Sequence, residues 1–494
     1  MKKLEELSFN NTYAHLGDAF SSRVMPTAAP DPYLVAFNPD AAALIDLDPS
    51  EAQRPEFLEY FSGARSFAGA EPVAMVYAGH QFGSRVPRLG DGRAILLGEV
   101  PSPRGKWDLH LKGSGQTPYS RQGDGRAVLR SSIREYLCGE AMHALGISTT
   151  RTLCIVGSDE TVFRETPETR AMIVRMAPSH VRFGSFEYFY FHHHSDPEMQ
   201  RQRLRELADY VIAQHYPEFT GLGEARYAAW LREVSVRTAH MIAQWQSVGF
   251  AHGVMNTDNM SILGLTLDYG PFGFMEKFDP HFICNHSDHT GRYAFSQQPY
   301  IGLWNLHVLA QVLVPLIGEE TAFDAIKSYE PAYHARMMAL YAAKLGLSGG
   351  EQPGDPEFIT RLLQLMQKAA VDYTGFFRAL GDAGTAAGDA RMLEFFAGPE
   401  VRELWDVWKS TYQARLQVAG APDHRQRMNR VNPKYVLRNH LAQRAIEDAE
   451  RGNFSEIEKL RVLLSRPFEE HPDLASYAEP STDRGAQVVV SCSS

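Results

Sequence analysis

The sequence predicts an α+β protein with two lobes, a small strand-rich lobe followed by a large helical one. Three observations support this fold class. The chain has 494 residues, which is more than one typical hydrophobic core can organise. Strand-like runs separated by Gly and Pro fill the first part of the chain. Beyond about residue 200, apolar residues recur mainly at helical spacing.

The composition changes along the chain divide it into four segments. We expect an extension at 1–70 that wraps the lobes, an N-terminal lobe at 71–185, a helical C-terminal lobe at 186–465, and a polar tail at 466–494 that contains Cys492. The strands expected in the N-terminal lobe lie at 94–100, 107–111, 152–156 and 171–176, around one helix at 127–145. The aromatic run at 186–191 is also expected to be a strand. Further helices are expected at 224–248, 303–316, 319–345, 357–380, 390–417 and 434–463.

The overall charge and the cysteine content exclude several classes of protein. A net charge of −10 argues against a nucleic-acid partner. Four scattered cysteines are too few for a disulfide framework or a zinc site. The sequence shows neither a secretory signal nor an apolar stretch judged long enough to span a bilayer. We therefore expect a cytoplasmic monomer without a membrane partner.

A glycine-containing turn opens the strand at 94–100. In RLGDGRAILLGE (88–99), Gly90 and Gly92 would let the backbone approach a phosphate, and Arg93 would add positive charge. A plain hairpin turn is the alternative interpretation. A second glycine-rich segment, GSGQTPYSRQGDGR (113–126), could hold an anion on the backbone N–H groups of Gly123 and Gly125, or could be a flexible loop.

A lysine ends the strand at 107–111, and a glutamate lies on the helix that follows. Pairing of Lys112 with Glu135 is the arrangement by which kinase-like folds hold an ammonium group on nucleotide phosphates. Alternatively, Ser132 and Glu135 form a capping box, in which the carboxylate only accepts a backbone N–H. Further along, Arg175 and Arg182 suit polyphosphate recognition, or are ordinary salt-bridge partners.

The stretch HGVMNTDNMSILGLTLDYG (252–270) follows the helix at 224–248. We expect a two-stranded hairpin, 260–263 with 265–267, that returns Asp268 beside Asn259. Amide and carboxylate oxygens are the ligands that Mg²⁺ prefers. Asp258 precedes Asn259 and could serve as a base. The alternative interpretation is an Asx-turn followed by a loop aspartate.

Together these parts resemble the protein-kinase fold, with one informative departure. Kinases carry H-R-D-x-x-x-x-N, in which the aspartate is the catalytic base. Here the same frame reads HGVMNTDN (252–259), so Val254 occupies the position of that base. The metal ligands of the frame are retained.

The whole chain from about residue 8 resembles the selenoprotein O family more closely. The strings HLKGSGQTPYSRQGDGRA, HGVMNTDNMSILG and NPKYVLRNHLAQ are typical of that family, and Cys492 lies where some members carry selenocysteine. The resemblance implies a pseudokinase fold and a protein adenylyltransferase that binds ATP reversed relative to kinases. AMP, or UMP from UTP in some members, would pass to Ser, Thr or Tyr hydroxyls of target proteins, with release of pyrophosphate.

The resemblance also implies roles for individual residues. Asp258 would accept the proton, Glu135 would orient Lys112, and Asn259 and Asp268 would ligate Mg²⁺ or Mn²⁺. The nucleotide would be held by Gly90, Gly92, Arg93, Lys112, Asp124, Gly125, Arg175, Arg182 and Asp268.

Two other functions and one regulatory device stay open from the sequence. A small-molecule phosphotransferase of the aminoglycoside-kinase type has a similar His-Gly loop, but that loop also needs an aspartate at position 254. A non-catalytic binding module is the third candidate. Separately, Cys492 on the tail and Cys284 could form a redox-sensitive pair that tunes access to the cleft.

Overall fold

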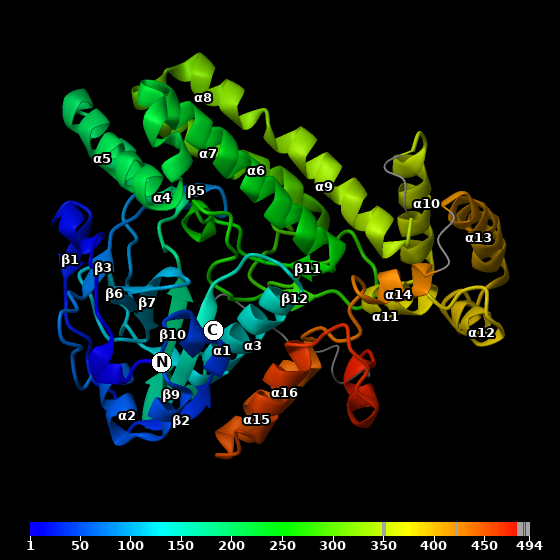
Figure 1. Ribbon diagram of the computed structural model, residues 1–494, viewed down its shortest axis with the longest axis horizontal. Helices are drawn as coiled ribbons and strands as arrows, with labels where there is room; N and C mark the ends of the chain where they lie inside the picture. The colour runs from blue at the N-terminus through cyan, green and yellow to red at the C-terminus, as the bar shows by residue number, and fades with distance from the viewer. Residues whose placement is uncertain (348–351, 420–422, 482–487, 489, 491–494) are drawn as a thin grey trace.

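In the computed structural model, a strand-rich lobe lies at one end and helices make up the rest of the molecule (Figure 1). The structure describes residues 1–347, 352–419, 423–481, 488 and 490. An 8-stranded antiparallel sheet forms the N-terminal lobe, in the order β1-β3-β6-β7-β10-β9-β2, with β8 paired to β10. Its strands are β1 (Ser21–Arg23), β2 (Tyr33–Phe37), β3 (Val73–Met75), β6 (Ala94–Ser102), β7 (Gly105–Lys112), β8 (Ala127–Val128), β9 (Arg151–Phe163) and β10 (Pro167–Ala177). The four strands and the helix expected in this lobe are confirmed.

The sheet is buried on both faces because its strands alternate between two cores. Leu109 and Leu111 on β7 pack in one core with residues of the N-terminal helices α1 (Pro39–Leu44) and α2 (Pro55–Phe61). The other face packs against α3 (Leu129–Ala144), which contributes Ile133 and Leu137. The period of two places Lys112 on this second face, opposite Ile173 of β10. Lys112 therefore faces the helix that carries Glu135.

Residues 1–70 are integrated into this lobe rather than lying outside it. Strand β1 pairs with β3 at one edge of the sheet, and β2 pairs with β9 at the other. The N-terminal segment thus supplies both outer strands.

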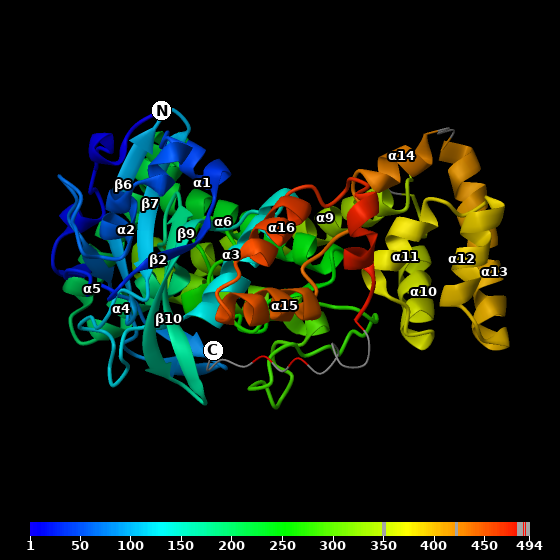
Figure 2. The same cartoon turned by 90° about the horizontal axis from the view of Figure 1, so that it is seen from below.

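After β10 the chain is mainly helical, with two groups of helices (Figures 1 and 2). The first group contains α4 (Phe183–His192), α5 (Pro197–His215), α6 (Arg226–Ser247), α7 (Gln298–Ile317), α8 (Glu319–Ile326) and α9 (Tyr329–Lys344). An outer group with its own core contains α10 (Asp355–Lys368), α11 (Tyr373–Leu380), α12 (Ala386–Phe395), α13 (Pro399–Ala419) and α14 (His424–Asn429). The chain then returns to the sheet with α15 (Asn439–Glu450) and α16 (Ser455–Leu464).

The expected strand at 186–191 is wrong, because this run lies within the helix α4. Phe186 and Phe189 are spaced by three residues and both reach the main core, so helical packing overrides the strand preference of the aromatic side chains. Four expected long helices are each divided: 319–345 into α8 and α9, 357–380 into α10 and α11, 390–417 into α12 and α13, and 434–463 into α15 and α16. In the second case Ala370 adopts a φ of 49°, which a continuous helix cannot contain.

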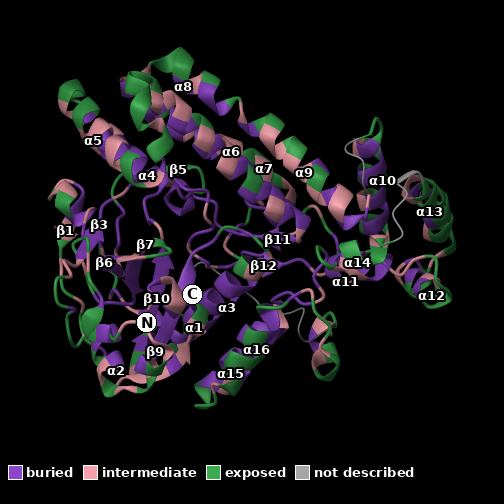
Figure 3. Ribbon diagram, in the orientation of Figure 1, coloured by how far each residue is buried: buried purple, intermediate pink, exposed green. Residues whose placement is uncertain are grey.

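One helical segment contradicts the expectation that no apolar stretch is long enough to span a bilayer. By length and composition alone, Phe295–Ile317 could cross a bilayer. Half of the residues in the most apolar part of this segment are buried within the protein. The helix α7, which makes up most of the segment, packs against α6 and α8. Figure 3 shows this alternation of buried and exposed residues along the helices. The apolar run is accounted for by core packing.

The helix α3 is fixed from several directions. Helices α15 and α16 pack against it, and they lie beside it in both ribbon views (Figures 1 and 2). Arg134 donates from Nη2 to the carbonyl of Phe272 at 2.8 Å, and the Tyr136 hydroxyl donates to the carbonyl of Phe37 at 3.2 Å. The position of Glu135 is therefore set by both lobes and by the C-terminal helix pair.

Candidate active site

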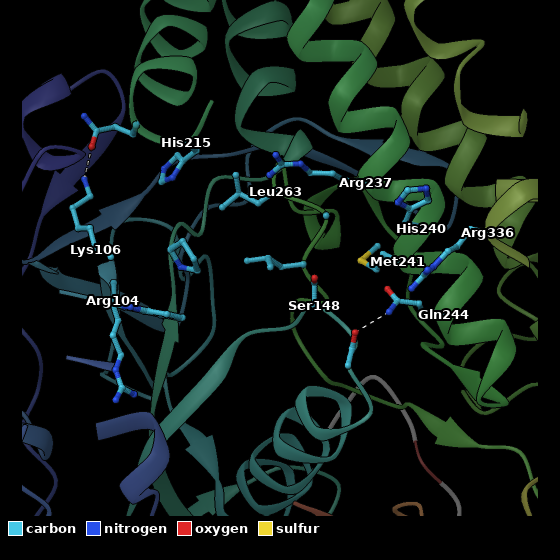
Figure 4. Close-up of a pocket in the computed structure, with 17 residues that line it drawn as sticks. Arg104, Lys106, Ser148, His215, Arg237, His240, Met241, Gln244, Leu263 and Arg336 are labelled. Atoms are coloured by element: carbon cyan, nitrogen blue, oxygen red, sulfur yellow. Dashed lines mark hydrogen bonds between the residues drawn. The ribbon is translucent and has the colours of Figure 1, made fainter. Parts of the chain in front are cut away.

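Two cavities of similar size lie on either side of the 259–268 segment. One, of about 710 Å³, is lined by the ends of this segment, Asn259 and Asp268, and by both glycine-containing loops. The other, of about 700 Å³, is lined by the tip of the segment, Leu263 to Leu265, with basic residues from β7, α6 and α9 around it (Figure 4). The predicted site residues in the first cavity are Gly90, Gly92, Arg93, Lys112, Asp124, Gly125, Asp258, Asn259 and Asp268. None of these lines the second, so the first is the candidate active site.

A buried network of two cations and two carboxylates lies at the wall of this cavity, with Lys112 and Asp268 lining it and Glu135 and Arg175 behind them. Lys112 Nζ lies 2.7 Å from Glu135 Oε2 and 3.4 Å from Asp268 Oδ1. Arg175 lies between the same two acids, with Nη2 at 3.1 Å from Glu135 Oε2 and 2.5 Å from Asp268 Oδ1. Glu135 is thus committed to side-chain cations. The capping-box alternative is wrong, because α3 begins at Leu129 and Ser132 lies inside it, where its hydroxyl donates to the carbonyl of Val128.

Charge pairing decides the ionisation of this network. Burial alone would raise the pKa of Glu135 and of Asp268, but Arg175 and Lys112 hold both pKa values below their ordinary range. Burial and the neighbouring charge of Arg175 lower the pKa of Lys112, against the opposing effect of Glu135. Both carboxylates are therefore ionised at neutral pH, and Asp268 presents a negative charge to the cavity.

The segment between Asn259 and Asp268 folds back on itself, though less regularly than expected. Met260 and Thr266 form a single antiparallel bridge, and Gly264 turns the chain with a φ of 68°. The expected pair of regular strands is wrong, because Thr266 is also engaged elsewhere. Its N–H donates to the carbonyl of Ser148 at 2.9 Å, and Trp245 Nε1 donates to its hydroxyl at 2.9 Å.

The ends of this segment offer oxygen atoms suited to a divalent cation. Asn259 donates from Nδ2 to the carbonyl of Val254 at 3.1 Å, which orients its amide oxygen as the remaining ligand atom. Asp268 is ionised and adopts a φ of 59°, a strained conformation for this residue. In the described part of the chain, no cluster of three or more His, Cys, Asp or Glu could hold a metal. Two protein oxygens with substrate phosphates are the set typical of Mg²⁺.

Asp258 lies next to Asn259 in a different environment. Its Oδ2 accepts a hydrogen bond from Gln81 Nε2 at 3.2 Å, and its backbone carbonyl accepts one from Arg182 Nη1 at 2.9 Å. Its Oδ1 is buried with no hydrogen-bond partner among the described residues. Burial raises the pKa of Asp258 to about 7, against the smaller opposing effects of Gln81 and Arg182. A carboxyl with this pKa can accept a proton near neutral pH.

The two glycine-containing loops pack against each other at the mouth of the cavity. Gly90 has a φ of 89°, and a Cβ there would lie 2.5 Å from the ring of Tyr119. Gly125 has a φ of 71°, and a Cβ there would lie 2.1 Å from the backbone of Gly115. Gly90 is thus required by the contact between the two loops, and Gly125 by the close folding of the 113–126 loop on itself. The 113–126 segment is an ordered part of the wall.

The charged residues of these loops differ in how they are engaged. Asp124 accepts hydrogen bonds from Arg164 at 2.8 and 3.0 Å and from the N–H of Arg126 at 2.9 Å. Within the described ranges, Arg93 has no ion-pair partner, and its positive charge lowers the pKa of Asp268. Arg93 therefore faces the cavity with its charge uncompensated by a direct partner.

Arg175 and Arg182 are not among the residues that line the cavity. Arg175 is engaged by Glu135 and Asp268, and Arg182 stacks on Tyr77 with its Cζ 4.4 Å from the ring centroid. Sequence reasoning also missed several lining residues, among them Tyr77, Gln81, Phe82, Phe163 and Arg164. They come from three places without a recognisable motif: Tyr77 precedes β4, Gln81 and Phe82 lie in the β4–β5 hairpin, and Phe163 and Arg164 lie at the turn between β9 and β10.

The predicted cysteine pair falls partly outside the described residues, because Cys492 is not among them. Cys284 is buried, and its thiol donates to the carbonyl of Ala251 at 3.4 Å. Nearby, the carbonyl of Val490 accepts a hydrogen bond from the N–H of His286 at 2.8 Å.

Comparison with known proteins gives matches along nearly the full chain. The family described as "Protein adenylyltransferase SelO" matches residues 3–465. A protein nucleotidyltransferase YdiU of Myxococcus xanthus is 57% identical over 499 residues, covering 100% of both chains. Proteins of the same name from Thioalkalivibrio sulfidiphilus and Pseudomonas fluorescens are 56% and 53% identical, again over 100% of both chains.

Proposed function

The chain belongs to the SelO family of protein adenylyltransferases and is an enzyme of nucleotidyl transfer, and we propose that it moves AMP from ATP to hydroxyl groups of target proteins. The acceptors would be Ser, Thr or Tyr side chains. The oxygen of the acceptor forms a bond to the α-phosphorus, the bond from that phosphorus to the bridging oxygen of the β-phosphate breaks, and pyrophosphate leaves with the bonding electrons. The hydroxyl proton passes to a carboxylate of the protein.

The observation that carries this proposal is the separation of two acidic environments around the cavity. Asp268 is held ionised by Lys112 and Arg175, whereas burial raises the pKa of Asp258 to about 7. One carboxylate is thus suited to a cation and the other to a proton. Val254, which lines the same cavity, cannot act as the base that a kinase has at this position.

We propose that Asn259 and Asp268 hold Mg²⁺ or Mn²⁺, which when bound would neutralise phosphate charge. Lys112 and Arg93 would contact phosphate oxygens, and Glu135 would keep the Lys112 ammonium in place. Arg175 and Arg182 would act from behind the wall, Arg175 by fixing Asp268 and Arg182 by fixing the backbone of Asp258. If ATP lies reversed relative to kinases, the terminal phosphates occupy this deep cationic end.

The nucleoside would then lie toward the glycine loops, near Asp124 and Gly125. Gly90 and Gly92 allow the first loop to approach the second closely, so the nucleotide would be enclosed by backbone on this side. Discrimination between ATP and UTP would be decided here, and transfer of UMP is part of the same proposal.

The experiment that tests the proposal compares two labels. The protein is incubated with Mg²⁺ or Mn²⁺ and with ATP labelled at either the α- or the γ-phosphate, and its intact mass is measured in parallel. Adenylyl transfer predicts protein-bound α-label and a mass increase of one AMP. Label from the γ-position alone would refute it and favour a phosphotransferase. A wild-type protein that transfers neither label, with Lys112→Ala and Asp268→Ala changing only partner binding, would favour a binding module.

A redox role for the tail is a separate proposal, which rests on the position of Val490 beside His286 and thus near Cys284. We propose that Cys492 can be oxidised onto Cys284 and so restrict access to the cleft. Peptide mapping of the non-reduced protein after treatment with peroxide is expected to show a 284–492 linkage, and its absence would remove this idea.

A further inference from the structure

A short hairpin lies directly over the segment that carries Asp258. Strands β4 (Gly79–Gln81) and β5 (Ser84–Val86) pair around a two-residue turn. The N–H of His80 donates to the Thr257 hydroxyl at 2.7 Å. The N–H of Phe82 donates to Asn256 Oδ1 at 3.1 Å and to the Tyr293 hydroxyl at 2.9 Å. The hairpin is therefore held on the segment 256–258 by its own backbone.

The hairpin contacts both oxygens of the Asp258 carboxyl. Gln81 Nε2 donates to Oδ2 at 3.2 Å. On the other side, a Cβ on Gly79 would lie 2.5 Å from Oδ1, so the hairpin backbone packs against this oxygen. Gln81 is the one side chain that donates a hydrogen bond to this carboxyl within the described residues. The hairpin thus fixes the direction in which the carboxyl points.

The tip of the hairpin is strained and exposes an aromatic ring. Phe82 and Gly83 have φ values of 50° and 82°, as a tight hairpin turn of this type requires. For Phe82 this conformation costs about 1–2 kcal/mol, yet its side chain is 39% exposed. The ring lines the cavity beside Val254. A bulky residue that is strained and partly solvent-exposed is not explained by core packing, which points to function.

The cavity has two chemically different ends. The end at the glycine loops carries the arginines at positions 93, 121, 126 and 164. The end at the hairpin is formed by the uncharged residues Gln81, Phe82, Val254 and Asn256, together with the Asp258 carboxyl. In the proposed function the nucleotide occupies the part of the cavity between Lys112 and the glycine loops, where these arginines lie. This leaves the hairpin end for the second substrate.

We propose that the β4–β5 hairpin is the acceptor side of the site, where Gln81 positions the Asp258 carboxyl toward the incoming hydroxyl and Phe82 contacts the acceptor chain. This inference rests on the proposed function and assigns its second substrate to a surface. Gln81 acts through Asp258 and is a positioning residue.

The surroundings of the tip indicate what kind of acceptor fits. Arg85 stacks on Phe191 with its Cζ 4.6 Å from the ring centroid, and Arg292 stacks on Trp304 at 4.7 Å. Across the described part of the chain, neither guanidinium has a salt bridge. An acceptor with acidic residues beside its hydroxyl would supply the missing counter-charge.

The test uses the full-length protein, α-labelled ATP with Mn²⁺, and dephosphorylated casein as an acidic, hydroxyl-bearing acceptor. Gln81→Met keeps the side-chain volume and removes the donor, and is expected to lower kcat roughly tenfold, a part of the full effect of a general base. The KM for casein and the affinity for ATP should stay within about twofold. Phe82→Gly relieves the strained φ, and is expected to raise the KM for casein about three- to tenfold with kcat unchanged.

Tyr300→Ala is the matched control, because it removes an aromatic ring that is 70% exposed on α7. Wild-type kcat and KM are expected for this variant. Unchanged kinetics in both hairpin variants, or an equal loss of ATP affinity and kcat, would overturn the inference while leaving the proposed function intact. A wild-type protein that transfers no α-label to casein or to itself would refute the function and the inference together.

Discussion

Asp258→Asn is expected to make the metal-free protein more stable while abolishing transfer. Both effects have one cause. Burial raises the pKa of Asp258 from 3.8 to about 7, so the folded protein binds a proton at this group more tightly than the unfolded chain. The stability associated with this proton is fully present below pH 3.8 and is lost as the pH rises through 7. Above pH 7 the folded protein holds a buried carboxylate with one side-chain donor.

The size of the effect follows from the shift. The pKa of Asp258 rises from 3.8 to about 7 on folding. At about 1.4 kcal/mol per pKa unit, the stability gained by removing this charge has an upper limit of about 4 kcal/mol. The asparagine amide does not pair ideally with the Gln81 amide, so we expect a gain of about 2–3 kcal/mol at pH 8. The gain should be small at pH 4, increase up to pH 7, and then stay constant.

Urea unfolding followed by circular dichroism at several pH values, in buffer with EDTA, measures this gain. Asp18→Asn is the control, because Asp18 is exposed and its replacement should change the free energy of unfolding little. Transfer of AMP by Asp258→Asn should fall by roughly 10²–10⁴. A variant that is no more stable than wild type at pH 8, or whose advantage grows on acidification, would refute the reasoning.

Three further changes test other parts of the structure. Glu135→Gln leaves the buried cations Lys112 and Arg175 with a neutral partner. We expect the free energy of unfolding, measured in urea, to fall by about 3 kcal/mol and the rate of transfer to fall at least ~100-fold; a variant with normal stability would contradict the network. Gly125→Ala places a Cβ 2.1 Å from the backbone of Gly115. Gly105→Ala is the control, because Gly105 also has a positive φ, of 112°, but a Cβ there has no atom within 4 Å. Only Gly125→Ala should weaken ATP binding in a calorimetric titration. Burial lowers the pKa of Lys344 from 10.5 to about 7. The free energy of unfolding of Lys344→Met should therefore exceed that of the wild type by about 3 kcal/mol at pH 7, and the difference should shrink toward pH 10. A difference that does not depend on pH would exclude the burial of the Lys344 charge as its cause.

Local patterns predicted the strands β6 and β7 and the helix α3 well, because the residues of β6 and β7 alternate between two cores and the four-residue repeat Ile133, Leu137 and Ala141 in α3 faces the main core. They failed at 186–191, where the aromatic side chains favour a strand locally but pack on the main core from a helix. They also missed where the long helices divide; between α10 and α11, for example, the chain turns at Ala370 and then bonds to the distant residues Phe278 and Glu276.

At the site, the sequence identified the residues but not the partners of each charge. Lys112, Glu135 and Asp268 belong to recognisable motifs, yet nothing in the motifs shows that Arg175 bridges the two acids from behind. Gln81 and Phe82 were not predicted at all, because the short hairpin around Gly83 becomes meaningful only when it lies on Asn256 and Asp258.

The packing of α15 and α16 on α3 has a consequence for regulation. Protein kinases are commonly switched by moving the helix that carries the glutamate away from its lysine. Here such a swing would require the C-terminal helix pair to detach and the Arg134 and Tyr136 hydrogen bonds to break. We therefore expect this enzyme not to use that switch, and expect its output to follow the supply of nucleotide, cation or acceptor, or the proposed linkage of the tail.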